Sequence, residues 1–421
     1  MAKPPGSSSG DTPDPPSLWR NRDFLLLWSG DAISALGSQA SQLALPLLAL
    51  AITGSPAQVG LLGAMRGGAY LLFGLPAGAL IDRWNRRTVM VLADALRALA
   101  FASIPLALLG GWLTPQQLFV VVAIEGVGFI AFGLAHTASA PRVVPRVQLP
   151  TALAQSQSLD SVARTIGPAL GGALFAVSRP LPFIADAISY ALSVAAILAI
   201  RTPLAAARTA REPHLGREIM AGVAWLRRQP TLLALTLVNG AVNFVYGGLP
   251  LLVIALAQRR GADAAAIGLI FTLGGLGTAL GAALTPAVLR RRTVGGIMTA
   301  SVWIFALAWV PYALAPNPLA LAVTLAGGLA LAALYNGAGL VYRLVHTPDA
   351  MQGRVIGVAR LLTYGGQAAG YALMGVLIQR CGAVTAAWLM LLPSLILAVA
   401  TTASAAVRRA PRVNDTETAP T

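Results

Sequence analysis

Residues Phe24–Ile52 read FLLLWSGDAISALGSQASQLALPLLALAI, an apolar run that contains a single carboxylate, that of Asp31. About 20 apolar residues in a helix are enough to cross the hydrocarbon core of a bilayer, and this run is longer than that. A carboxylate inside such a run is costly because lipid does not solvate it, and acids in this position usually have a function. The run therefore predicts a transmembrane helix and makes Asp31 a candidate functional residue.

Comparable apolar runs recur along the whole chain of 421 residues, of which 56% are hydrophobic and only 11% are charged. Soluble proteins carry about 25% charged residues, so a water-facing surface cannot be built from this composition. The runs are continuous rather than alternating, which favours helices over a β-barrel. The expected fold class is an all-α polytopic protein of the lipid bilayer.

The hydropathy pattern predicts about twelve transmembrane helices in two six-helix halves. The expected spans are 23–51, 57–81, 88–110, 116–140, 151–177 and 181–201, then 230–257, 264–289, 294–315, 318–345, 353–379 and 382–407. The expected regions are a disordered tail (1–22), an N-terminal bundle (23–201), a linker (202–228), a C-terminal bundle (229–408) and a second disordered tail (409–421).

Arginines gather in alternate loops, whereas the loops containing TGSPAQ, GGWLTP and APNP have none. Arg179, Arg259, Arg260 and Arg380 are exceptions, but they are outnumbered. Basic loops mark the cytoplasmic side, so both termini and the linker are expected in the cytoplasm, in a protein of the cell membrane. The net charge of +15 reflects this asymmetry and not a nucleic-acid site.

The linker sequence LGREIMAGVAWLRRQP spaces apolar residues at helical intervals beside arginines, which predicts an amphipathic helix at the inner membrane surface. The single cysteine, Cys381, excludes an intramolecular disulfide, and the three histidines have no metal-ligand spacing. No phosphate-binding loop of the form GxxxxGK[ST] occurs, and no nucleophile–base arrangement indicates an enzyme. No cofactor or metal is expected.

The two halves resemble each other at an offset of about 205 residues, as do AQVGLLGAMRGGAYLLFGLPAGALIDRWNRRT and AAIGLIFTLGGLGTALGAALTPAVLRRRT. A duplicated six-helix unit is typical of secondary transporters, whose site lies between the halves. The duplication therefore predicts transport of a small molecule through the interface of the two bundles.

The loop GALIDRWNRRT, Gly78–Thr88, resembles the cytoplasmic signature loop of the major facilitator superfamily, with Asn85 where the pattern has glycine. Asparagine can adopt the left-handed turn that glycine would supply. The resemblance implies a cytoplasmic latch between the halves, formed by Gly78, Asp82, Arg83, Arg86 and Arg87. The equivalent loop of the second half has Thr285-Pro286 in place of the acid.

The fifth expected span contains RTIGPALGGAL, which resembles the antiporter motif found mostly in exporters of this superfamily, with Ala163 in place of a glycine. Its members here are Arg164, Gly167, Pro168, Gly171 and Gly172. The glycines predict close packing on a neighbouring helix, and the proline predicts a kink. FLLLW, TGSPAQVGLL, DALRA and HTPDAMQGRVIG narrow the resemblance to the enterobactin-exporter and macrolide-efflux branch.

Five acids lie within the expected spans, all in the first half. Asp94 with Arg97 and Asp160 with Arg164 have the spacing of local ion pairs, and Asp186 lies close enough to a helix end for a solvated or capping role. Asp31 and Glu125 have no basic residue one turn away and are the proton-coupling candidates. A static ion pair with Arg66 or Arg164 is the alternative for both.

The resemblance implies that spans one, four, seven and ten line the central cavity. The polar residues there are the substrate-cavity candidates Gln39, Asn239, Asn243, Tyr246, Tyr335 and Asn336. Ordinary hydrogen bonds between helices are the alternative for these residues. The expected function is export of an amphiphilic small molecule (a drug, siderophore or secondary metabolite) by a monomer that exchanges it for protons. Uptake of a small solute and a non-transporting receptor or scaffold are the alternatives.

Overall fold

The computed structural model describes residues 18–81, 84–204, 215–408 and 410. The first half contains η1 (Leu18–Arg20), α1 (Arg22–Thr53), α2 (Pro56–Ile81), α3 (Arg86–Gly110), α4 (Pro115–Val143), η2 (Arg146–Gln148), α5 (Leu149–Val177) and α6 (Leu181–Ala199). After α7 (Leu215–Arg227), the second half contains α8 (Pro230–Tyr246), α9 (Leu249–Arg259), α10 (Ala264–Arg291), α11 (Val294–Leu314), α12 (Pro318–His346), α13 (Asp349–Cys381), α14 (Ala383–Ala403) and α15 (Ala405–Arg408).

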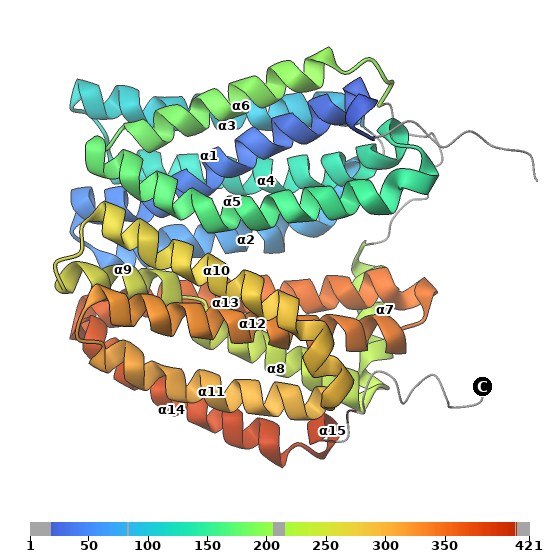
Figure 1. Cartoon of the computed structure of the whole chain (residues 1–421), viewed down its shortest axis with the longest axis vertical. Coiled ribbons are helices and arrows are strands. Elements are labelled where there is room, and N and C mark those ends of the chain that lie inside the picture. Colours follow the sequence, from blue (N-terminus) through green and yellow to red (C-terminus); the bar gives the residue numbers. More distant parts are fainter. Residues whose placement is uncertain (1–17, 82–83, 205–214, 409, 411–421) are drawn as a thin grey trace, which may run out of the picture.

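The long helices of the described residues follow the two six-helix halves expected from the sequence. Ten helical segments, with α8 and α9 taken together, are long and apolar enough to cross a membrane, and α2 and α5 run beside them (Figure 1). Side chains of Asn21, Thr114, Asp263, Thr293 and Asn317 accept backbone N–H bonds at the starts of five of these helices. The predicted all-α polytopic fold is confirmed.

The seventh span differs from the single helix expected over 230–257, because it is broken between α8 and α9 at Gly247 and Gly248. Pro250 has no N–H to donate to the carbonyl of Tyr246, so the helical hydrogen-bond ladder cannot continue through this point. The two glycines also lie close to the backbone of α13 at Gln367 and Gly370, where a side chain would collide. The break therefore lets α13 approach the middle of the seventh span.

The two halves meet along two helix pairs, α2 with α13 and α5 with α10. Glycines make the closest approaches: Gly60 faces Gly375 in the first pair, and Gly172 faces Gly268 in the second. Both contacts lie toward the end of the molecule that carries α9, here called the α9 end. In Figure 1 the halves converge at that end, on the left, and diverge toward the opposite α7 end.

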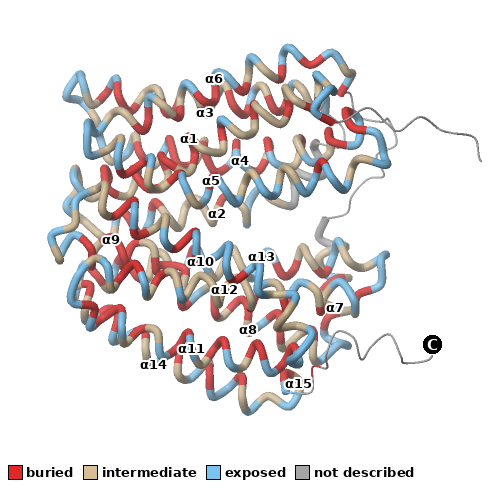
Figure 2. Tube along the Cα trace, viewed as in Figure 1, coloured by how far each residue is buried: buried red, intermediate tan, exposed pale blue. Residues whose placement is uncertain are grey.

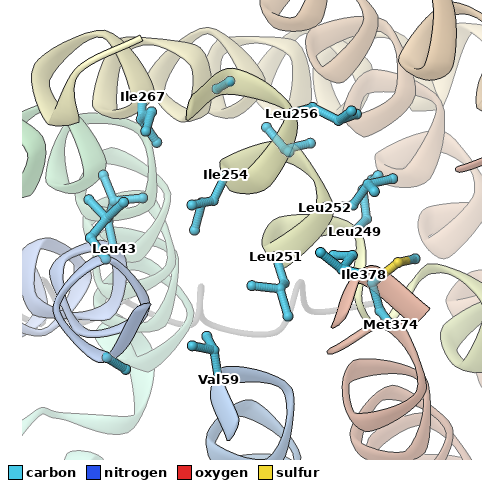
Figure 3. Close-up of a cluster of buried hydrophobic side chains, with 14 of the residues drawn as sticks. Leu43, Val59, Leu249, Leu251, Leu252, Ile254, Leu256, Ile267, Met374 and Ile378 are labelled. Atoms are coloured by element: carbon cyan, nitrogen blue, oxygen red, sulfur yellow. The ribbon is translucent and has the colours of Figure 1, made fainter. Parts of the chain in front are cut away.

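An apolar cluster closes the α9 end between the halves. Figure 3 shows Leu251 and Ile254 of α9 with Leu43 of α1 and Val59 of α2, and all of these side chains are buried in one cluster. Met374 of α13 joins the same cluster from the second half. Helix α9 therefore acts as an apolar plug that belongs to one half and packs against the other.

The outward faces of the bundles are apolar. Leu72, Leu99, Leu109 and Leu392 are each more than 60% exposed, and buried and exposed residues alternate along the long helices (Figure 2). Exposed leucines in such numbers fit a surface in contact with lipid. The predicted linker helix is present as α7, which buries Leu226, exposes Met220 and packs its Gly222 against the backbone of Arg354.

Candidate functional site

A cavity of about 510 Å³ lies between the two halves, on the α7 side of the apolar plug. Helices α1 and α5 form its wall in the first half, and helices α8 to α13 form its wall in the second. Cavities of this volume hold organic molecules of drug size. The second half contributes most of the lining residues, so the cavity is asymmetric.

The wall in the second half is aromatic. Tyr246 and Phe305 lie with ring centroids 5.3 Å apart, and Tyr335 meets Phe305 edge to face at 5.9 Å. Phe271 and Tyr312 complete the aromatic lining. The hydroxyl of Tyr246 donates to the carbonyl of Phe305, which fixes its ring. This wall offers flat apolar surface to a ligand.

Five of the six predicted substrate-cavity residues line the cavity: Gln39, Asn243, Tyr246, Tyr335 and Asn336. Asn239 does not, because its side chain donates to Thr363 on α13 at 2.8 Å and borders a separate small pocket beside Arg343. Asn243 donates in turn to the backbone carbonyl of Asn239 at 2.8 Å. The two amides share a helix face, as their spacing predicts, yet only one of them reaches the cavity.

Two hydroxyls at the cavity have no partner. Tyr312 and Tyr335 are 1% and 2% exposed, and no hydrogen-bond acceptor for either hydroxyl lies within the described residues. A buried donor without an acceptor is destabilising, and polar groups of this kind mark sites that a ligand or water completes. The two hydroxyls are therefore part of the site, and the sequence singled out only Tyr335.

Helix α5 carries the predicted antiporter motif, and its glycines pack tightly. Gly167 and Gly171 lie against Gln39 and Ala40 of α1, whereas Gly172 lies against α10 of the other half. Through this motif, α5 packs both on α1 of its own half and on α10 of the other half. Arg164, three residues before Gly167, lines the cavity together with Pro168.

The expected ion pair between Asp160 and Arg164 is absent, although both residues are described. Arg164 is exposed and has no ion-pair or hydrogen-bond partner in the described part of the chain. Spacing of four brings two side chains to one face of a helix but does not fix their rotamers. The guanidinium is thus free to meet a ligand.

Asp31 is half-buried and lies beside a histidine that the sequence reasoning did not select. Its carboxylate is 3.9 Å from Nε2 of His136 on α4, and the two side chains are 19% and 15% exposed. Among the described residues no arginine lies within ion-pair distance of Asp31. Nothing in the sequence links positions 31 and 136, because only the packing of α1 on α4 brings them together.

Glu125, the other proton-coupling candidate, is buried between two arginines. It lies 2.9 Å from Arg66 of α2 and 3.6 Å from Arg97 of α3. Arg97 also pairs with Asp94 at 3.1 Å, as the spacing of these two residues predicts. The resulting ion-pair network joins α2, α3 and α4. It contains the static ion pair of Glu125 with Arg66 that was the alternative to a proton-coupling role.

Asp186 corrects an expectation, since its side chain is fully buried and not solvated or at a helix end. Its carboxylate accepts hydrogen bonds from Ser41 on α1 and from Ser189 at 3.2 Å on its own helix. Nearby, the guanidinium of Arg97 makes a cation–π contact with Tyr190, 4.1 Å from the centroid of its ring. The position of Asp186 near a helix end did not predict its burial, because α1 covers this face of α6.

The predicted latch lies partly outside the described residues, which exclude Asp82, Arg83 and the side-chain environment of Gly78. Arg86 donates to the carbonyl of Ala138 at 2.8 Å, and Arg87 donates to the carbonyl of Ile200. Both arginines therefore bind helix ends within the first half. Asn85 is not left-handed as expected. It has extended dihedral angles, and its side chain caps the start of α3.

Comparison with known proteins agrees with this architecture. The curated macrolide efflux protein A of Streptococcus pyogenes is 29% identical over 225 residues, which are 53% of this chain and 56% of that protein, so the match spans about half the length of this relative. The enterobactin exporter EntS of Shigella boydii is 28% identical over 79% of each chain.

Solved structures share the fold at low identity. The nucleoside transporter NupG aligns with a TM-score of 0.71 at 15% identity, over 90% of this chain and 98% of that one. A bacterial homologue of the iron transporter ferroportin aligns with a TM-score of 0.68 at 19% identity, over 92% and 98%. The sequence profile of the family described as "Transmembrane secretion effector" matches residues 15–420. This multi-pass membrane protein therefore belongs to the transmembrane secretion effector family of the major facilitator superfamily, a family of transporters and not of enzymes.

Proposed function

We propose that this protein exports an amphiphilic small molecule from the cytoplasm by alternating access, driven by protons that move inward. The observation that carries the proposal is the cavity between the halves, which has an aromatic wall on one side and polar side chains on the other. A small-molecule cargo of mixed polarity matches such a lining. The protein acts as a monomer, because one chain contains both walls.

The arrangement of the halves supports alternating access. At the α9 end the plug and the glycine contacts of α2 with α13 and of α5 with α10 separate the cavity from that side. Rocking of one half against the other about this contact would reverse the access, as in other two-bundle transporters. The arginine-rich loops support a cytoplasmic position for the α7 end and both termini. The cavity then loads from inside the cell.

The direction of transport is supported by the names of the relatives, a macrolide efflux protein and an enterobactin exporter. The antiporter motif of α5 agrees with export, because its Gly172 forms part of the contact with α10 that would have to open and close. The latch formed by Gly78, Asp82, Arg83, Arg86 and Arg87 would hold the cytoplasmic ends together in the opposite state.

Asp31 with His136 is the proposed proton site. Both side chains are partly exposed, and neither is held in an ion pair with an arginine of the described chain. A carboxylate–imidazole pair can gain a proton from one side and lose it to the other with little change in structure. Glu125 is the second candidate, although two arginines neutralise it.

The test uses everted membrane vesicles whose lumen has been acidified, with a pH-sensitive dye and a panel of dansyl amphiphiles. We expect addition of a transported amphiphile to release lumenal protons and the amphiphile to accumulate in the lumen. Asp31→Asn should abolish proton release. Asp263→Asn is the matched control, since Asp263 is a helix cap outside the cavity and asparagine caps equally well.

Accumulation that survives a protonophore would contradict proton coupling. Movement of amphiphiles only into right-side-out vesicles would contradict export. Proton release by Asp31→Asn at the wild-type rate would transfer the proton role from Asp31 to Glu125.

A further inference from the structure

We infer that the cavity binds organic anions: amphiphiles with a flat apolar body and one negatively charged, acceptor-rich group. This inference rests on the proposed function, because it names the cargo class of the same cavity. Arg164 is the only charged residue among the described residues that line the cavity, and no carboxylate lines it. The formal charge that a bound molecule meets is therefore positive.

Arg164 is available to a ligand. Its nearest acid in sequence, Asp160, lies one helical turn away on α5 but outside ion-pair distance, and the guanidinium makes no hydrogen bond within the described chain. A guanidinium binds carboxylates and other planar oxyanions through two parallel hydrogen bonds. Asp160 attracts the guanidinium only from beyond ion-pair distance, so an anionic cargo would supply the hydrogen-bonded partner that the described residues do not.

Two buried hydroxyls at the cavity can also donate to a ligand. The hydroxyls of Tyr312 and Tyr335 are buried at the cavity wall without an acceptor. The hydroxyls of Ser161 and Thr165, by contrast, are engaged with backbone carbonyls of their own helix at 2.9 and 2.8 Å. The amides of Gln39, Asn336 and Gln367 also line the cavity without a side-chain hydrogen bond to the described residues, and they can donate or accept. The guanidinium of Arg164 and the two buried hydroxyls are therefore the groups that favour a ligand rich in oxygen acceptors.

A cationic cargo is the competing interpretation, because aromatic rings attract cations through their faces. Such sites need the cation to lie over a ring without a like charge close by. Here Arg164 shares the cavity with the aromatic wall, and every buried acid of the described first half is turned to the ion-pair network or to serine hydroxyls. Repulsion by an unpaired guanidinium disfavours a cation, and the rings then serve as apolar surface.

The experiment measures binding to the purified full-length protein in lipid nanodiscs with three probes that share one fluorophore and one chain length. They are dansyl-aminohexanoate, which is an anion, dansyl-hexylamide, which is neutral, and dansyl-cadaverine, which is a cation. We expect the anion to bind more tightly than the neutral probe and the cation to bind most weakly. Arg164→Ala should weaken binding of the anion about tenfold and leave the neutral probe unchanged.

Further variants separate charge from shape. Arg164→Lys should retain part of the preference, and Arg164→Glu should reverse it toward the cation. Tyr312→Phe and Tyr335→Phe should each weaken binding of the anion several-fold. Arg259→Ala is the matched control, because Arg259 is exposed at the end of α9 and does not line the cavity, and it should bind all probes as the wild type does.

Equal or tighter binding of the cation overturns the inference, as does an equal loss of all three probes in Arg164→Ala. Failure of the folded protein to bind any probe also overturns it. If the binding order holds while the vesicles release no protons, the proposed function fails and the anion site stands. If the vesicles transport but the binding order is reversed, the inference fails alone.

Discussion

The two halves of this protein share one fold but differ in the chemistry of their interiors. The first half buries Asp94, Glu125 and Asp186 together with Arg97, whereas the second half has no acid inside any described helix beyond the first turn. In the second half the polar interior consists of uncharged groups, namely serine, threonine and tyrosine hydroxyls and amides, and several of the tyrosines and amides line the cavity. Duplicated helices can thus be specialised separately, one set around charge and the other around a ligand.

This difference affects how each half is stabilised. In the first half the ion pairs of Arg66, Glu125, Arg97 and Asp94 join three helices, so each charge depends on its neighbours. In the second half the hydroxyls of Tyr312 and Tyr335 have no partner within the described residues, so their burial lowers stability. We expect substitutions to distinguish the halves by the free energy of unfolding that they cost.

The largest effect is expected from Arg97→Met, which would leave Asp94 and Glu125 buried with less compensation. Removing one member of a buried ion pair costs about 3–5 kcal/mol. Arg343→Met is the matched control in the second half, because Arg343 is also partly buried but has no acidic partner in the described chain and donates to the carbonyl of Gly339. Chemical denaturation in detergent micelles measures both, and equal losses would refute the contrast between the halves.

A second, smaller effect should be the same in both halves, because both use glycine for close helix packing. Gly171 meets the carbonyl of Ala40, and Gly277 meets that of Ala326. Overpacking by a larger side chain costs about 1–3 kcal/mol, so Gly171→Leu and Gly277→Leu should be destabilised alike. Gly133→Leu, whose added carbon meets open space, is the control and should unfold as the wild type does. A cost in only one half would show that packing differs as well as charge.

Tyrosine hydroxyls of the second half should differ from one another by about 1 kcal/mol in unfolding free energy. Tyr246→Phe loses the hydrogen bond to the carbonyl of Phe305 and should be destabilised by that amount. Tyr335→Phe removes a hydroxyl without a partner and should be as stable as the wild type or slightly more so. Thermal unfolding of the two variants side by side measures the difference, and a destabilised Tyr335→Phe would assign that hydroxyl a structural partner.

The smallest effect on stability is expected from Asp31→Asn, although it lies in the charged half. Its carboxylate is partly exposed and its recorded ionic neighbour is a histidine at 3.9 Å, a contact worth less than about 1 kcal/mol. Glu125→Gln should lose far more in the same denaturation experiment. A large loss of stability in Asp31→Asn would make Asp31 part of the structural ion-pair network. It would then no longer be a good candidate for gaining and losing a proton.

Local features of the site could be predicted because they depend on spacing within one helix. Asp94 and Arg97 form their pair at an interval of three, and Asn239 and Asn243 share a face at an interval of four. The same argument failed for Asp160 and Arg164, because an interval of four permits a pair without requiring one. Gly167 and Gly171 pack closely as the motif predicts, since their role depends on size alone.

Contacts between helices could not be predicted from the sequence. The approach of His136 to Asp31, the burial of Asp186 under α1 and the diversion of Asn239 to Thr363 each depend on how one helix is rotated against another. The break at Gly247 was missed because apolar residues continue on both sides of it. No pattern of hydropathy reports such a break.

The sequence by itself determined the membrane spans and which loops carry the arginines, because transfer of about 20 apolar residues into lipid is decided by composition alone. It also determined that the acids inside the expected spans would all lie in the first half. Tertiary structure alone decided which of those acids are paired, which hydroxyls are left without partners and which residues border the cavity. The ion-pair partner of a buried group and its exposure to solvent depend on atoms of other helices. These atoms come together only when the bundles pack.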